Sequence, residues 1–87
     1  MKELEIQEEN KEGFVYYIQE EGTKRVKIGW AWDVKDRLQT LQCGNSKDLL
    51  ILKTIKTKKP WELEKQLHDR FSQFRIRGEW FSSDVIN

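Results

Sequence analysis

Residues 13–30, GFVYYIQEEGTKRVKIGW, constrain the fold more than any other part of the chain. Two short apolar runs, rich in aromatic and β-branched residues, flank the connector EEGTK, whose glycine can take a positive φ. This pattern predicts a β-hairpin with strands over about 13–19 and 25–29. A chain of 87 residues has room for one core, so the hairpin commits that core to a sheet with antiparallel strands.

The rest of the chain alternates between helix and strand signals. Asp33 is a suitable N-cap for a helix with the apolar stripe Val34, Leu38 and Leu41, and CGNS at 43–46 ends that helix. LLILKTI then predicts a buried central strand over about 49–56. Pro60 suits the first turn of a second helix, whose predicted core face consists of Leu63, Leu67, Phe71 and Phe74.

The segment RIRGEWF predicts a turn and one brief edge segment packed back on the body. The order is therefore β-β-α-β-α, which predicts a small α+β domain with a central, mostly antiparallel three-stranded sheet flanked by helices. We expect this single domain to span 13–87. Residues 1–12, MKELEIQEENKE, are expected to form an acidic N-terminal arm.

Composition limits the compartment and the partners. The one cysteine, Cys43, excludes an internal disulfide and indicates a reducing environment. No apolar run reaches about 18 residues and no signal-peptide pattern opens the chain, so we expect a soluble, cytoplasmic protein without a membrane partner. The net charge of +1 conceals an acidic first quarter followed by a basic body over 24–77. This asymmetry fits a polyanionic partner, and it also fits a solvated surface of mixed charge.

Several polar residues beside the predicted core are candidates for chemistry. Tyr16 and Tyr17 alternate across the first strand, so one is expected to face the core and the other a surface or cleft. Lys27 in the second strand and Arg37 on the first helix can contact phosphate. Glu64 and His68 share a face of the second helix, where they can hold a divalent ion or hydrogen-bond each other. Each residue taken alone also suits an ordinary structural place.

In sequence order, these pieces resemble the GIY-YIG nuclease family. The matching segments are GFVYYI, KIG, the DRLQTL helix with Arg37 and the LEKQLH segment with Glu64. VKIGW, DRLQTLQCGN, EKQLHDRF and the closing RGEWF resemble a compact phage and bacterial subfamily most closely. The resemblance extends over residues 13–81. Each motif is loose, and the order and spacing of the five make the match specific.

The resemblance implies metal-dependent hydrolysis of phosphodiesters in DNA. Glu64 would hold a single Mg²⁺ or Mn²⁺ ion, and Tyr16 would activate or orient the water nucleophile. Arg37 would neutralise charge on the phosphate, and His68 would assist proton transfer or position the water. Lys27 stands where the family has its second tyrosine, and it would keep a phosphate contact and place a cation near Tyr16. Trp30 and Trp32 would stack on bases, or else belong to the core and a subunit contact.

Two other readings stay open at this point. One is a module with weak or absent cleavage that binds nucleic acid, a nucleotide or a protein, such as a phage regulator or anti-defence factor. The other is a structural or oligomerising domain, for which a homodimer or another protein partner is expected.

Overall fold

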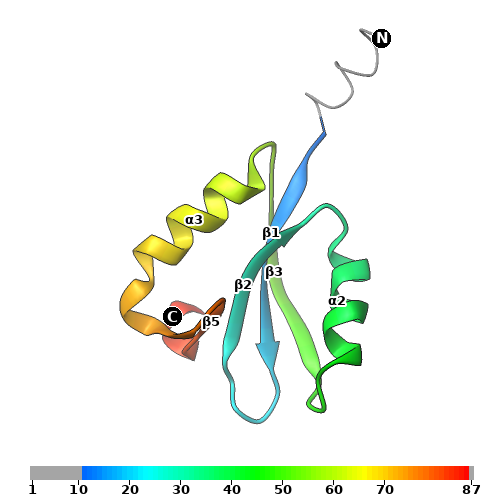
Figure 1. The fold of residues 1–87 in the computed structure, drawn as a ribbon, viewed down its shortest axis with the longest axis vertical. Helices are drawn as coiled ribbons and strands as arrows, with labels where there is room; N and C mark the ends of the chain where they lie inside the picture. The colour runs from blue at the N-terminus through cyan, green and yellow to red at the C-terminus, as the bar shows by residue number, and fades with distance from the viewer. Residues whose placement is uncertain (1–10, 87) are drawn as a thin grey trace, which may run out of the picture.

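The computed structural model describes residues 11–86 (Figure 1). The chain forms β1 (Gly13–Glu20), β2 (Val26–Ala31), α2 (Val34–Cys43), β3 (Leu49–Thr57) and α3 (Pro60–Arg70). It continues through a 3₁₀ turn (Ser72–Phe74), β4 (Arg75–Arg77), β5 (Trp80–Phe81) and a second 3₁₀ turn (Ser83–Ile86). The expected acidic arm falls almost wholly on residues 1–10, which lie outside the described residues.

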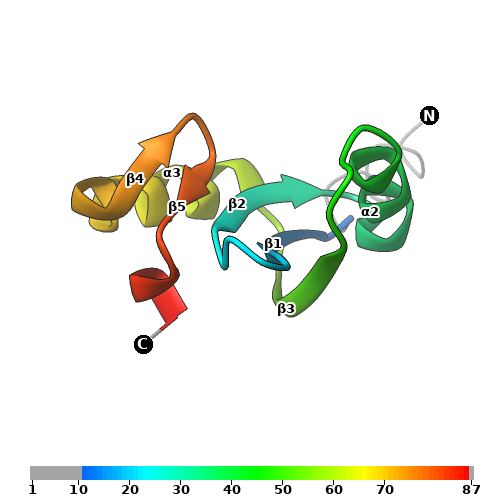
Figure 2. The same cartoon turned by 90° about the horizontal axis from the view of Figure 1, so that it is seen from below.

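The strands make one antiparallel sheet in the order β3-β1-β2-β5-β4. The predicted α+β class is confirmed, whereas the predicted count of three strands is wrong. The prediction of a buried central strand over about 49–56 is also wrong, because β3 lies at the edge of the sheet and none of its residues is fully buried. RIRGEWF forms two short paired strands, β4 and β5, because Gly78 adopts a positive φ of 55° and reverses the chain between them. Figure 2 shows these two strands beside α3, with β1 and β2 between them and α2.

The two helices cover opposite faces of the sheet and define two cores (Figure 1). Because side chains alternate along β1, Val15 and Tyr17 pack on the α3 side, while Tyr16 and Ile18 pack on the α2 side. Tyr16 is 0% exposed and Tyr17 is 3% exposed. The expectation that one of these tyrosines faces a surface or cleft is therefore wrong, because each face of β1 carries a core.

The helix boundaries follow the sequence signals at three of four ends. Asp33 caps α2 by accepting a hydrogen bond from the Asp36 N–H at 3.0 Å, and Pro60 occupies the first turn of α3. However, α3 ends at Arg70, so Phe71 and Phe74 lie in the connection after it rather than on its face. Both rings still pack against the α3-side core, which explains why their spacing looked helical.

Among the described residues, no helix combines the length and the apolar character needed to cross a membrane.

Candidate active site

The β1–β2 register places Tyr16 directly opposite Gly29. A Cβ atom on Gly29 would collide with Tyr16 Oη, so the phenol occupies the space above the β2 backbone that only glycine leaves open. The same Cβ position would lie 3.1 Å from Glu79 Oε1, which comes from the turn between β4 and β5. Gly29 therefore brings the phenol and a carboxylate to one point on the α2 side of the sheet.

The hydroxyl of Tyr16 is buried and has no hydrogen-bond partner among the described residues. Burial raises the pKa of this phenol, and the negative charges of Glu79 and Glu64 act in the same direction. The Arg37 guanidinium approaches closely enough to lower the pKa, although it does not complete a hydrogen bond to Oη. The phenol is thus neutral at neutral pH, and buried polar atoms are so regularly paired that its unpaired hydroxyl calls for an explanation.

Arg37 and His68 both bind the outer edge of β2. Strand β5 pairs with β2 only at Val26 and Lys27, so the backbone groups beyond Lys27 need other partners. The Ile28 N–H donates to the Glu79 carbonyl at 3.0 Å, and the Ile28 carbonyl accepts from His68 Nε2 at 2.8 Å. The Trp30 carbonyl accepts a long hydrogen bond of 3.5 Å from Arg37 Nη1.

His68 uses both of its ring nitrogens within the protein. While Nε2 donates to the Ile28 carbonyl, Nδ1 accepts a hydrogen bond from Arg75 Nη2 at 3.1 Å. This pair of bonds selects the neutral tautomer that carries its proton on Nε2. In this arrangement the ring fixes the position of Arg75 and of the β2 edge, and neither nitrogen is left for a metal ion.

Glu64 lies half-buried on α3, facing the same edge. Burial raises its pKa, and the neighbouring Glu79 carboxylate raises it further. The positive charge of Lys27 and the Trp30 backbone N–H oppose these effects. Two carboxylates therefore face each other in a partly desolvated place, a situation that an added cation would relieve.

Lys27 neutralises one of these carboxylates. Its Nζ lies 3.3 Å from Glu79 Oε1, and its side chain is only 17% exposed. The ammonium also lies 5.3 Å from the centre of the Trp80 ring. This ion pair and the exposed Arg37 side chain are polar groups beside the unpaired phenol.

The fold thus brings Tyr16, Lys27, Arg37 and Glu64 together near Gly29. His68 binds the adjacent edge of β2. Trp30 and Trp32 lie next to this group in an aromatic cluster.

Glu79 was not singled out from the sequence, although it stands in the RGEWF segment. The signal that could have found it is the glycine before it, since Gly78 marks a tight turn that presents the following side chain.

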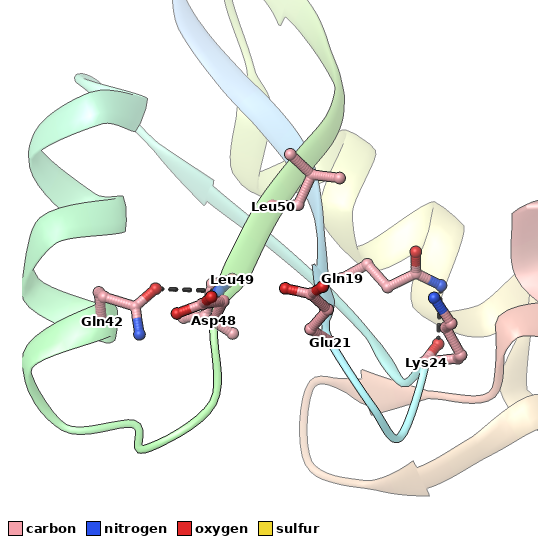
Figure 3. A pocket seen from close by; sticks show the side chains of 7 residues that line it. All are labelled: Gln19, Glu21, Lys24, Gln42, Asp48, Leu49 and Leu50. Carbon is pink, nitrogen blue, oxygen red and sulfur yellow. Dashed lines mark hydrogen bonds between the residues drawn. The ribbon is translucent and has the colours of Figure 1, made fainter.

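A surface pocket of about 460 Å³ lies elsewhere, where β1 ends and β3 begins (Figure 3). Its amides serve the backbone: Gln42 Oε1 accepts from the Leu49 N–H at 2.9 Å, and Gln19 Nε2 donates to the Lys24 carbonyl at 3.0 Å. None of the residues predicted to carry chemistry lines this pocket, so we assign its polar groups to the stability of the turn.

The protein ligand set for a metal ion is small. Within residues 11–86, no three His, Cys, Asp or Glu side chains gather closely enough to form a metal-binding group. Glu64 with Glu79 nevertheless suits Mg²⁺, which is commonly held by one or two carboxylates and completed by waters and substrate phosphate oxygens.

The model of one protein family, the T5orf172 domain, matches residues 13–86. The chain belongs to the T5orf172 domain family. The prediction of a GIY-YIG nuclease is corrected by this finding, because the matching family model is the T5orf172 domain and not the family expected from the motifs. No curated protein and no solved structure matched the chain. Membership of the T5orf172 family is consistent with an interaction with nucleic acid.

Proposed function

We propose that this T5orf172 domain hydrolyses phosphodiester bonds in nucleic acid, with DNA as the expected substrate. The observation that carries the proposal is the buried, unpartnered hydroxyl of Tyr16, which lies among a guanidinium and two carboxylates. A fold that only needed packing would gain from phenylalanine here, because an unsatisfied hydroxyl costs stability. A water molecule or a phosphate oxygen would satisfy it once the side chains above it move.

Tyr16 is proposed to orient the attacking water. With a raised pKa, the phenol is a hydrogen-bonding group in its resting state rather than a base. It becomes a competent base only when positive charge near it outweighs burial and the two carboxylates. Arg37 supplies part of that charge.

Arg37 and Lys27 are proposed to bind the phosphate. The Arg37 side chain is exposed and held only by the long bond to the Trp30 carbonyl, so it is free to form two parallel hydrogen bonds to phosphate oxygens. Lys27 would exchange its contact with Glu79 for one with the substrate. Both cations would then offset the negative charge that grows on the phosphate in the transition state.

Glu64, with Glu79 as a second carboxylate, is proposed to hold one Mg²⁺ or Mn²⁺ ion. When bound, such an ion polarises the phosphate and stabilises the leaving oxygen. His68 is proposed as a positioning residue, because its two hydrogen bonds hold the β2 edge against α3 and β4. The part in proton transfer or in positioning the water that was expected from the sequence stays a prediction.

A second function is a module that binds nucleic acid without cutting it. The observation that favours this function is the Lys27–Glu79 ion pair, which neutralises a carboxylate that a metal ion would otherwise use. The homodimer or protein partner expected from the sequence stays a prediction.

The test is to incubate the protein with supercoiled plasmid and with single-stranded DNA in Mg²⁺ or Mn²⁺. We expect nicking or cleavage by the wild type, and a loss of about a hundredfold or more in Glu64→Gln and Tyr16→Phe. Tyr16→Phe should unfold at the same temperature as the wild type or higher, because it removes an unpaired hydroxyl. The matched control is Glu62→Gln, an exposed carboxylate on the same helix, which should cleave normally.

Salt-sensitive binding without cleavage by the wild type would overturn the hydrolase and support the binding module. Cleavage that survives both Glu64→Gln and Tyr16→Phe would show that this group of residues is not the active site.

A further inference from the structure

Three tryptophans from two elements form a continuous cluster beside the candidate active site. Trp30 and Trp32 come from the end of β2 and the residue after it, and Trp61 from the first turn of α3. The ring centres of Trp30 and Trp32 are 5.3 Å apart, those of Trp30 and Trp61 are 5.9 Å apart, and those of Trp32 and Trp61 are 6.3 Å apart. All three pairs meet edge to face, so the cluster presents differently oriented ring planes rather than one stack.

The three rings differ in what they contribute to the fold. Trp30 is half-buried and packs against the α3-side core. Trp32 is 41% exposed and rests on Gly13, where a Cβ atom would lie 3.0 Å from its ring. Trp61 is 48% exposed and follows the buried Pro60. The core thus accounts for Trp30, and the backbone close to Gly13 accounts for one side of Trp32, while nearly half of Trp61 is left to solvent.

The position of Trp61 ties it to the proposed chemistry. Trp61 and Glu64 are three residues apart on α3, so their side chains are neighbours on one face of the helix. Trp30 joins the two regions, because its carbonyl accepts from Arg37 and its N–H faces Glu64. A nucleotide whose phosphate lies between Arg37 and Glu64 would therefore have its base within reach of Trp61.

The charges around the cluster suit a nucleotide. Lys11 Nζ lies 4.5 Å from the centre of the Trp32 ring, and the exposed Lys59 precedes α3. Besides Glu64, the acidic residues next in sequence to Trp32 and Trp61 are Asp33 and Glu62. Asp33 is engaged as the cap of α2, and Glu62 lies 3.9 Å from Lys59. Ammonium groups beside exposed indole rings match the alternating phosphates and bases of a nucleic acid strand.

We propose that Trp61, with Trp32 at its flank, stacks on an unpaired base next to the phosphate bound by Arg37, so that the substrate is single-stranded or locally unpaired nucleic acid. This inference rests on the proposed function. In an intact duplex the base faces are covered by their neighbours, so a protruding indole ring has nothing to stack on unless a base leaves the helix. A single strand offers its base faces directly, whatever its sequence.

The test measures binding in EDTA, so that no cleavage intervenes. Three fluorescent oligonucleotides of equal length are compared: a thymidine homopolymer, the same backbone with abasic sites, and a duplex. We expect the single strand to bind about tenfold or more tightly than the abasic strand, because stacking of a base on an aromatic ring is usually worth at least this much. Trp61→Ala should remove most of that difference, and Trp61→Phe should keep part of it. Leu50→Ala, at an exposed apolar residue on β3, is the control and should bind as the wild type does.

The outcomes separate this inference from the proposed function. Equal binding of the abasic and base-bearing strands, or no effect of Trp61→Ala, would overturn the stacking surface while leaving hydrolysis at Glu64 untouched. If Trp61→Ala instead abolishes self-association of the protein without changing nucleic acid binding, the cluster is a protein contact and the inference is wrong. If Glu64→Gln loses cleavage but still binds the base-bearing strand more tightly than the abasic strand, the result would support both the proposed hydrolysis and the stacking surface.

Discussion

At the scale of single residues, the site depends on one small side chain facing a large one. Tyr16 can lie over β2 only because Gly29 has no Cβ atom, and this contact fixes where the phenol hydroxyl stands relative to Glu79. Neither residue is informative by itself, since tyrosine and glycine are both ordinary in a hairpin. The information lies in the register that sets one opposite the other.

Gly29→Ala should therefore disturb both stability and the site. The new methyl group would overlap Tyr16 Oη, approach its Cζ at 2.7 Å and lie 3.1 Å from Glu79 Oε1, so the ring has to move. We expect the free energy of unfolding in urea to fall by about 1–3 kcal/mol, as is usual when a packed place is overfilled. Gly44→Ala is the matched control. At Gly44 the nearest atom is 3.9 Å from the new Cβ and φ is −95°, so its unfolding should hardly change. Equal behaviour of the two variants would contradict the close approach at Gly29.

At the scale of elements, α2 is held more weakly than α3. It has no fully buried residue and rests on the half-buried stripe Val34, Leu38 and Leu41, whereas α3 buries Pro60 and Leu67. The N-terminal cap of α2 therefore also affects the candidate active site, because Arg37 lies in the first turn of this helix. The α2 helix is the element through which the guanidinium can most easily change its distance from the phenol.

Asp33→Ala should loosen this helix. Losing the bond from the Asp36 N–H to the Asp33 carboxylate is expected to cost about 1 kcal/mol. Hydrogen exchange should speed up in α2 amides ahead of those in β1. Asp33→Asn is the control, because its amide oxygen can still accept that bond. Uniform acceleration across the whole protein would indicate that α2 does not open separately.

The elements were largely predictable from the sequence and the site only partly so. Cap residues, apolar periodicity and the Pro60 signal are local, so the hairpin, both helices and β3 were expected close to where they lie. Phe71 and Phe74 were wrongly assigned to the helix, because residues that pack against one core can have helical spacing without lying in a helix. The short strand β5 depends on pairing with β2 across the chain, and β4 pairs in turn with β5, which no local pattern encodes. Gly78 signals the turn that carries Glu79, but the contact between Glu79 and Tyr16 depends on the pairing of distant strands and has no local signal.

At the scale of the whole molecule, one buried carboxylate links stability to pH. Glu20 is 6% exposed at the end of β1, where it accepts from Thr23 Oγ1 at 2.6 Å and pairs with Arg25 at 3.2 Å. The hydrogen bond from Thr23 is the main cause that lowers its pKa, helped by Asn45 and Arg25 against the effect of burial. A lowered pKa in the folded state contributes stability above the pKa of the unfolded chain, and the contribution is lost as the pH falls through the folded value.

Glu20→Gln should thus lower the free energy of unfolding at pH 7 by about 1 kcal/mol, and the difference from the wild type should shrink below about pH 4. Chemical unfolding at a series of pH values measures both effects. Glu21→Gln, at the exposed neighbouring carboxylate, is the control and should track the wild type throughout. If the difference in free energy of unfolding between Glu20→Gln and the wild type stays constant with pH, Glu20 stabilises the fold by packing and not by its charge.

The side chains that bond the outer edge of β2 also protect solubility. A strand edge with free N–H and C=O groups is a template on which another molecule can add a strand and begin to aggregate. Beyond Lys27, that edge is closed by His68, Arg37 and the Glu79 carbonyl rather than by β5. Under the proposed function, selection against aggregation and selection for phosphate binding would act together on Arg37, and a variant that lost Arg37 or His68 would open this edge to self-association.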